Sequence, residues 1–290
     1  MCENDDLEYF ARRRPGLTRR HFGLAAIGAG VTAISGGAGA AQTQGQDVEI
    51  KTPAGTADAY FVHPAEGRHP GILVWPDIFG LRPAFKQMAT RLAESGYCVL
   101  VVNPFYRSKK APTAPEHADF SDPATRDALM KLRATLTPDT AKVDAKAFVA
   151  FLDQQPQVNT RRRIGTAGYC MGGPLVLQTA AAEPDRIGAG ASFHGGGLAT
   201  DKPDSPHLLI PKIEMAQFLI AIAENDDAKE PQAKTMLRES FAKAGLLAEI
   251  EVYAGTKHGW CPPDAAAYDH DQAEKAWARQ LSLFKRALKV

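Results

Sequence analysis

The sequence has almost no net charge. Its 290 residues include 34 lysines and arginines against 33 aspartates and glutamates, which gives a formal net charge of +1 at pH 7. A chain with so little imbalance creates no strong overall field to attract nucleic acid or an anionic membrane surface. We therefore expect a small-molecule partner and no nucleic-acid partner.

Metal-ligand spacing and redox motifs are also missing. The four cysteines form no C-x-x-C pair, and most of the histidines are scattered rather than spaced as metal ligands. Cys98 lies in an apolar run typical of a buried strand, where a thiol is a packing group. We expect neither a metal nor a cofactor. The histidines without metal-ligand spacing are His63, His69, His117, His207 and His270.

The N-terminal segment lacks a strongly apolar span. Its uncharged run at residues 22–41 is rich in glycine and alanine and binds hydrocarbon weakly, so a retained membrane anchor is the less favoured alternative. The run follows T-R-R-H-F-G-L, residues 18–24, which resembles a twin-arginine export signal. We predict that residues 1–41 are a signal peptide, cleaved near Ala40 or Ala41. The mature protein is then periplasmic or secreted, without stable membrane association.

The rest of the chain, residues 42–290, contains no internal repeat and no long low-complexity tract, which predicts a single domain. A hairpin is expected at residues 47–63, and after it short apolar runs alternate with segments of helical periodicity. This alternation predicts an α/β fold with a mostly parallel sheet and helices on both faces. The later strands are expected at residues 71–75, 98–102, 163–167, 189–193, 217–223 and 248–253, and the helices at 83–95, 142–154, 174–182, 232–244 and 265–288.

One strand leads directly into G-Y-C-M-G-G, residues 168–173. The segment has the G-x-nucleophile-x-G spacing, in which a sharp turn lifts the central side chain above the sheet and leaves no room for a Cβ at the glycines. The N-terminus of the following helix favours a thiolate at Cys170. Cys170 is therefore a candidate nucleophile. The alternative is an inert cysteine on a glycine-rich turn.

Two other strand ends supply the partners that a nucleophile needs. The strand at residues 217–223 is followed by E-N-D-D, and the strand at 248–253 is followed by a loop with His258. The carboxyl ends of parallel strands face one crevice, and the chain order nucleophile, acid, histidine is that of α/β-hydrolases. We predict a catalytic triad of Cys170, Asp226 and His258. Asp227 is the alternative acid.

These motifs, together with Y-A-G-T-K-H-G-W at residues 253–260, resemble the dienelactone hydrolase family, a cysteine-dependent branch of the α/β-hydrolases. The resemblance begins near residue 47 and extends to the C-terminus. It implies the α/β-hydrolase fold, with Cys170 as nucleophile, His258 as base and Asp226 as acid. The segment W-P-D-I-F-G, residues 75–80, is similar to a family segment whose glutamate contacts the resting thiol. Here that position is Asp77, and its alternative role is to cap the turn.

The resemblance also indicates groups around the reacting carbonyl. The backbone N–H groups of Ile78 and Met171 are the expected oxyanion donors. Family members that act on dienelactone hold its carboxylate with two arginines; Arg107 fits the first position, but the second is Pro262. Half of that clamp is therefore missing from this chain.

Two more residues at the same sheet edge are candidates for lining the substrate pocket. His194 ends a strand within S-F-H-G-G-G, and Trp260 follows His258 by two residues. For both, the alternative is a structural role. We predict that the triad, the oxyanion donors and the pocket-lining residues act on a small ester or lactone substrate.

The predicted reaction is hydrolysis of that ester or lactone through a thioester intermediate. A thiolate suits these substrates better than amides, whose amine leaves poorly in competition with the thiolate. One alternative is an exported binding protein without catalysis, which would predict a damaged triad. The other is a redox-active thiol protein, for which Cys261 is the available resolving cysteine.

Overall fold

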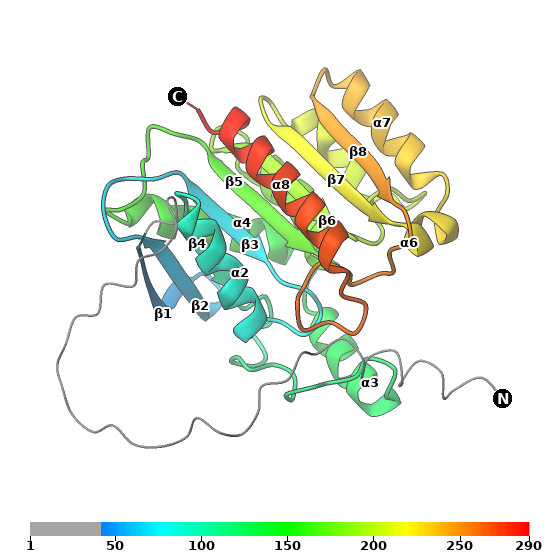
Figure 1. Ribbon diagram of the computed structural model, residues 1–290, viewed down its shortest axis with the longest axis horizontal. Coiled ribbons are helices and arrows are strands. Elements are labelled where there is room, and N and C mark those ends of the chain that lie inside the picture. Colours follow the sequence, from blue (N-terminus) through cyan, green and yellow to red (C-terminus); the bar gives the residue numbers. More distant parts are fainter. Residues whose placement is uncertain (1–41, 290) are drawn as a thin grey trace, which may run out of the picture. The chain divides into compact units, whose positions relative to one another are not determined.

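A computed structural model describes residues 42–289 (Figure 1). At their centre is an eight-stranded sheet in the order β1-β2-β4-β3-β5-β6-β7-β8. The hairpin β1–β2 and the pair β2–β4 are antiparallel, whereas every other pair of neighbours is parallel. The predicted α/β class with a mostly parallel sheet is therefore confirmed. The strands are β1 (Thr43–Thr52), β2 (Gly55–Pro64), β3 (Gly71–Trp75), β4 (Cys98–Val102), β5 (Ile164–Tyr169), β6 (Ile187–Phe193), β7 (Gln217–Ala223) and β8 (Ala248–Tyr253).

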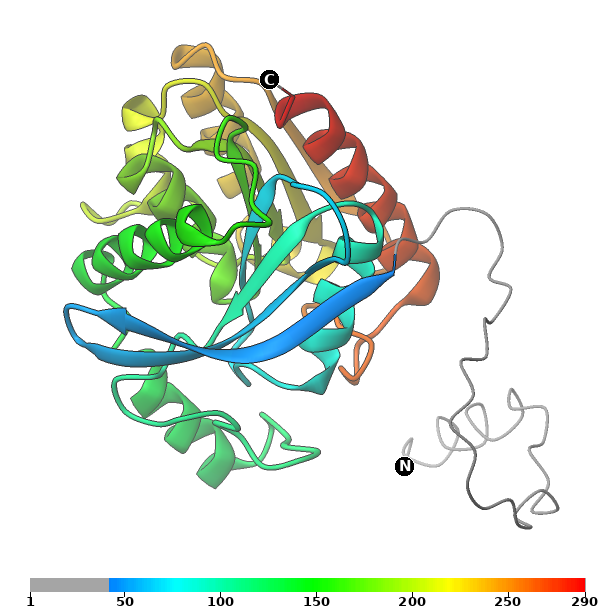
Figure 2. The same ribbon diagram turned by 90° about the vertical axis from the view of Figure 1, so that its left-hand side faces the viewer.

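Helices cover both faces of this sheet (Figures 1 and 2). One face packs against α2 and α8, and the other against α4, α5 and α7. Since both faces are covered, β3 and β4 are buried along their whole length, which explains their unbroken apolar sequences. The helices are α2 (Pro83–Glu94), α3 (Pro123–Arg133), α4 (Pro138–Gln154), α5 (Gly172–Ala182), α6 (Glu224–Lys229), α7 (Ala233–Lys243) and α8 (His270–Ala287), with a 3₁₀ helix at Pro206–Lys212.

Two local features between β4 and β5 differ from the sequence-based expectation. The helix expected from residue 142 begins at Pro138, where a capping box between Thr137 and Thr140 pairs the first amides. Helix α3 was not predicted at all. Its only buried residue is Leu129, so its sequence shows little apolar periodicity, and its start depends on capping by Asp122.

The parallel strands place their carboxyl ends along one edge of the sheet. The segments that follow these strand ends hold the predicted site residues, except Arg107, which follows β4; the last residues of the strands are Trp75, Tyr169, Phe193, Ala223 and Tyr253. No helix within residues 42–289 is long and apolar enough to cross a membrane. The predicted signal peptide at residues 1–41 lies outside the described part of the chain.

Candidate active site

The turn between β5 and α5 is a tight elbow with Cys170 at its tip. Cys170 has a φ of +54°, a left-handed conformation that is uncommon for a residue with a side chain. A Cβ on Gly168 would collide with the carbonyl of Gly172, and one on Gly172 would collide with the carbonyl of Trp75. The glycines are therefore required by close backbone approach, as the motif predicted.

The backbone around Cys170 holds the elbow in place. Its N–H donates to the carbonyl of Phe193 at 3.1 Å, which ties the turn to the neighbouring strand β6. Helix α5 begins at Gly172, so its unpaired amides and the positive end of its dipole lie beside the cysteine. The elbow therefore presents the Cys170 side chain at the N-terminal end of α5.

His258 contacts a carboxylate from the next strand end. Its Nδ1 lies 2.7 Å from Oδ2 of Asp226, and its backbone N–H donates to Oδ1 of Asn225 at 2.8 Å. Asp227, the alternative acid, instead accepts bonds of 2.7 and 2.6 Å from Nζ of Lys234. The geometry therefore pairs His258 with Asp226 and directs Asp227 away from it.

Cys170 and Asp226 both act on the protonation of His258. Burial by itself lowers the pKa of this imidazole. Contacts with the Asp226 carboxylate and the Cys170 sulfur outweigh that effect and raise the pKa to about 10. The protonation of His258 is thus coupled to both groups, as it must be for a residue that moves a proton to or from the sulfur.

Two backbone amides at this edge of the sheet have no hydrogen-bond partner within the described residues. The N–H groups of Ile78 and Met171 make no hydrogen bond to any residue in the described range. Ile78 lies in the loop after β3, and Met171 is the N-cap residue of α5. Unpaired amides from two adjoining segments are the usual composition of an oxyanion hole.

Asp77 is bound by an arginine. Both of its carboxylate oxygens accept bonds from Arg82, at 2.6 and 2.9 Å, and its Oδ1 also accepts from the N–H of Phe79 at 3.0 Å. Burial raises the Asp77 pKa, and Arg82 opposes that rise. Arg82 thus binds both oxygens of Asp77, and the contact of Asp77 with the resting Cys170 thiol stays a prediction. The bond to Phe79 matches the alternative role of capping the turn.

Arg82 joins two loops of the site. Besides Asp77, its guanidinium donates to both oxygens of Asp264, at 2.7 and 3.0 Å. Asp77 precedes Ile78, and Asp264 lies in the loop that follows His258. Sequence reasoning missed Arg82, since nothing in its local pattern indicates a partner 182 residues away.

Arg107 is held in an ion pair with a buried aspartate, and its contact with a substrate stays a prediction. Its guanidinium donates to both oxygens of Asp144, at 2.6 and 2.7 Å, and the Tyr106 hydroxyl donates to the same carboxylate at 2.7 Å. Asp144 is fully buried, so its charge requires this partner. Arg107 is therefore a structural ion-pair partner rather than a free group for a substrate carboxylate.

His194 and Trp260 lie beside the catalytic loop. The His194 ring centroid is 5.1 Å from that of His258 and 6.4 Å from the Trp260 ring. His194 is 1% exposed, and both ring nitrogens lack a hydrogen-bond partner within the described residues. Burial lowers its pKa well below the usual value, and the neighbouring His258 adds to that effect. His194 is therefore a neutral imidazole packed against the His258 ring.

No metal centre accompanies these residues. Within residues 42–289, no three histidine, cysteine, aspartate or glutamate side chains are placed to hold a metal ion. The groups that this edge of the sheet brings together are a thiol, an imidazole, a carboxylate and two unpaired amides.

Comparison with known proteins identifies the family. The family model of the dienelactone hydrolase family matches residues 57–288. Carboxymethylenebutenolidase of Rhodococcus opacus is 28% identical over 251 residues, which cover 83% of this chain and 90% of that protein. Protein usf of Aquifex pyrophilus is 28% identical over 251 residues, covering 84% and 99%. The chain belongs to the dienelactone hydrolase family and is a hydrolase, which confirms the resemblance seen in its motifs.

Solved structures show the same fold. A dienelactone hydrolase-like promiscuous phosphotriesterase from metagenomic libraries superposes with a TM-score of 0.69 at 22% identity, covering 87% of this chain and all of that one. Dienelactone hydrolase from Anabaena variabilis gives a TM-score of 0.59 at 17% identity, covering 86% and 100%. At these identities the likeness concerns the fold.

Proposed function

We propose that this protein hydrolyses a small carboxylic ester or lactone, with Cys170 as nucleophile, His258 as general base and acid, and Asp226 as the carboxylate that orients His258. The main support is the 2.7 Å contact between His258 Nδ1 and Asp226, together with the elbow that places Cys170 at the N-terminal end of α5; the Cys170 sulfur also contributes to the raised pKa of His258. Nucleophile, base and orienting acid in this order are the requirements of covalent acyl transfer.

The first half of the reaction forms a thioester. His258 already carries the proton that Cys170 gives up, as its raised pKa favours, and the sulfur attacks the carbonyl carbon of the ester. The resulting oxyanion accepts hydrogen bonds from the free amides of Ile78 and Met171. The carbon–oxygen bond to the leaving group then breaks, and His258 gives its proton to that oxygen.

The second half releases the acid. A water molecule loses a proton to His258 and attacks the thioester carbon. The tetrahedral intermediate collapses with cleavage of the carbon–sulfur bond, and the sulfur leaves as a thiolate beside protonated His258. Cys170 and a free carboxylic acid result, so the cycle consumes one water per ester bond.

The substrate class follows from the family and from the ion pairs of the site. The name of the Rhodococcus relative indicates a lactone substrate. In this chain Arg107 is ion-paired with Asp144, and residue 262 is a proline. Neither position of the family's carboxylate clamp therefore offers a free guanidinium. We therefore propose that the preferred ester or lactone does not depend on a carboxylate held by these two positions.

The test is hydrolysis of p-nitrophenyl acetate and of a small lactone by purified protein. Cys170→Ala and His258→Ala are expected to lower kcat/KM by about 10³-fold or more, because nucleophile and base act as a unit. Cys261→Ala is the control for the loss of a thiol, since Cys261 is buried and belongs to none of the proposed catalytic groups. Equal activity of Cys170→Ala and wild type would refute the mechanism.

We also propose that residues 1–41 direct twin-arginine export to the periplasm or the cell exterior. The support is the motif around Arg19 and Arg20, followed by a weakly apolar run. Replacing both arginines by lysine should retain the protein in the cytoplasm, as judged by cell fractionation. Unchanged export of that variant would exclude the proposal.

A further inference from the structure

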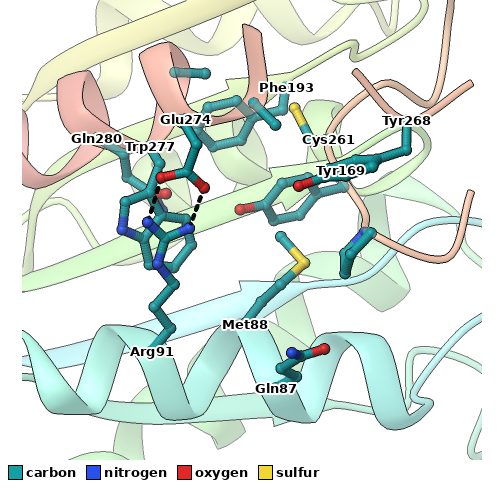
Figure 3. A pocket seen from close by; sticks show the side chains of 13 residues that line it. Gln87, Met88, Arg91, Tyr169, Phe193, Cys261, Tyr268, Glu274, Trp277 and Gln280 are labelled. Atoms are coloured by element: carbon teal, nitrogen blue, oxygen red, sulfur yellow. Dashed lines mark hydrogen bonds and ion pairs between the residues drawn. The ribbon is translucent and has the colours of Figure 1, made fainter. Parts of the chain in front are cut away.

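The loop between β8 and α8 carries His258 and is anchored in the core on both sides of it. Before His258, Thr256 is 3% exposed, and its hydroxyl donates to the Tyr253 carbonyl at 2.7 Å. After His258, Trp260 is 0% exposed, and its ring centroid lies 4.6 Å from that of Tyr253. The next residue, Cys261, lines a cavity beside the ends of β5 and β6 (Figure 3). Packing in the core therefore fixes both ends of the segment that contains His258.

His258 itself lies in a stretch that this packing does not reach. Its side chain is 35% exposed, and the preceding Lys257 is exposed as well. Gly255 and Gly259 have φ values of +76° and +90°, in the left-handed region that favours glycine. The His194 ring packs against His258, but its nitrogens have no hydrogen-bond partner within residues 42–289. The position of His258 therefore depends on polar contacts from another segment.

Those contacts come from the first residues of α6. Oδ1 of Asn225 accepts from the backbone N–H of His258 at 2.8 Å, and Oδ2 of Asp226 lies 2.7 Å from Nδ1 of the same residue. One residue earlier, the carboxylate of Glu224 accepts from the N–H of Gly255. Successive residues of one turn thus hold the start of the loop, the His258 backbone and the His258 ring.

Helix α6 is weakly anchored in the core. None of its six residues is buried. A short helix without a buried face takes its position from its polar contacts and from the strand that precedes it. Asp226 can therefore keep its contact with the imidazole only while the His258 backbone stays aligned with α6. Asn225 is the residue whose side chain joins that backbone to the helix.

We propose that Asn225 is a positioning residue, whose side chain holds the His258 backbone where the imidazole meets Asp226. It acts through the histidine and not on the substrate. Its loss should misplace the proton-transfer group slightly, and reaction rates respond steeply to such an error. The inference deepens the proposed function and rests on it, since it assumes that His258 is the base.

The first measurement is steady-state hydrolysis of p-nitrophenyl acetate by wild type, Asn225→Leu and Asn225→Asp. Leucine has a similar size but no acceptor, so kcat should fall about 10- to 100-fold. KM should change by less than about twofold, because the lost contact serves the chemical step and not substrate binding. Aspartate keeps the acceptor, so Asn225→Asp should recover kcat to within about threefold of wild type.

Asn159→Leu is the matched control. Oδ1 of Asn159 also accepts from a backbone N–H, that of Arg161 at 3.1 Å, and Asn159 is likewise half-buried. It precedes β5, so it lies at the sheet edge opposite the strand ends that carry the site. Both kcat and KM of this variant should equal those of wild type.

The second measurement is an NMR titration of the His258 imidazole, which needs no turnover. Burial lowers the pKa of His258, but Asp226 and Cys170 outweigh burial and raise it to about 10; the other ring that faces it, His194, is neutral. Asn225→Leu should lower this pKa toward 6.5, because the contact with Asp226 loosens. Asn159→Leu should leave it unchanged.

Three results would overturn the proposal. These are wild-type kcat in folded Asn225→Leu, an unchanged His258 pKa in that variant, and a loss in Asn225→Asp as large as in Asn225→Leu. Near-UV circular dichroism establishes that each variant is folded. An inactive wild type in which the His258 pKa still depends on Asn225 would refute the hydrolytic function and support the positioning contact.

Amide hydrogen exchange in wild type decides the matter if Asn225→Leu does not fold. The His258 N–H should exchange about tenfold more slowly than that of Lys257, which has no hydrogen-bond partner in the described part of the chain. Equal exchange rates of the two amides would also overturn the proposal.

Discussion

The three cysteines of the described chain differ because their surroundings differ. Burial raises the pKa of Cys98 to about 12, and it raises the pKa of Cys261 well above the usual value for a thiol. Both are therefore poor sources of thiolate. Cys170 instead lies at a helix N-terminus beside His258. Of these three cysteines, it is the one placed for nucleophilic chemistry.

A carboxylate pair tests the assignment of the acid. Asp226→Asn should lower kcat by about 10³-fold, since an amide supports the imidazolium poorly and can favour the wrong tautomer of His258. Asp227→Asn should retain most of the activity, because Asp227 contacts Lys234. Steady-state kinetics with p-nitrophenyl acetate compares the two. A larger loss in Asp227→Asn would reverse the assignment.

The raised pKa of His258 predicts how stability varies with pH. Folding raises this pKa from 6.5 to about 10, so the native state holds the proton more tightly than the unfolded chain. The resulting stabilisation is complete below pH 6.5 and is lost as the pH rises through 10. Urea unfolding at pH 7 and pH 10 should show a smaller decrease in unfolding free energy for His258→Gln than for wild type. Identical decreases would contradict the predicted coupling.

At the scale of elements, the elbow depends on backbone contact between β3, β5 and α5. Gly172→Ala would place a Cβ against the carbonyls of Trp75 and Pro76, and should destabilise the protein by about 1–3 kcal/mol. Gly196→Ala is the matched control, since nothing lies within 4 Å of its Cβ position; its effect should stay within about 0.5 kcal/mol. Urea denaturation measures both. Similar values for the two variants would show that the elbow tolerates a side chain.

The helices and strands also differ in how clearly the sequence predicts them. The strands that follow the hairpin were predictable, because runs such as 98–102 are apolar throughout. Helix α3 was not, since only Leu129 of its residues is buried and it therefore shows little apolar periodicity. The strand predicted at residues 163–167 is present as β5, but it extends to Tyr169 because β5 pairs along its whole length with β6.

At the scale of the whole molecule, Arg82 links segments that are far apart in the chain. Removing it leaves the Asp77 side chain, which is 8% exposed, without its charged partner. Arg82→Met should therefore cost about 3–5 kcal/mol and lower kcat/KM, because the loop with Ile78 loses its tie to the loop after His258. Thermal and urea unfolding, together with kinetics, measure both effects.

Lys86→Met provides the comparison for Arg82→Met. Lys86 also forms an ion pair from α2, with Asp47, but that carboxylate is 73% exposed. Its loss should cost no more than about 1 kcal/mol. A cost for Arg82→Met that is no larger than this would show that the bridge between the loops contributes little.

The sequence by itself determined the α/β class, the elbow around Cys170 and the candidate residues His258, Asp226 and Asp227, because hydrophobic periodicity and glycine spacing act locally along the chain. Only the tertiary structure selected Asp226 over Asp227, since that choice depends on where His258 and Lys234 lie. Tertiary contacts likewise pair Arg107 with the buried Asp144, and Arg82 with Asp77. The local sequence pattern indicates which charged side chains are available. The partner of each charge depends on segments that approach one another only when the chain folds.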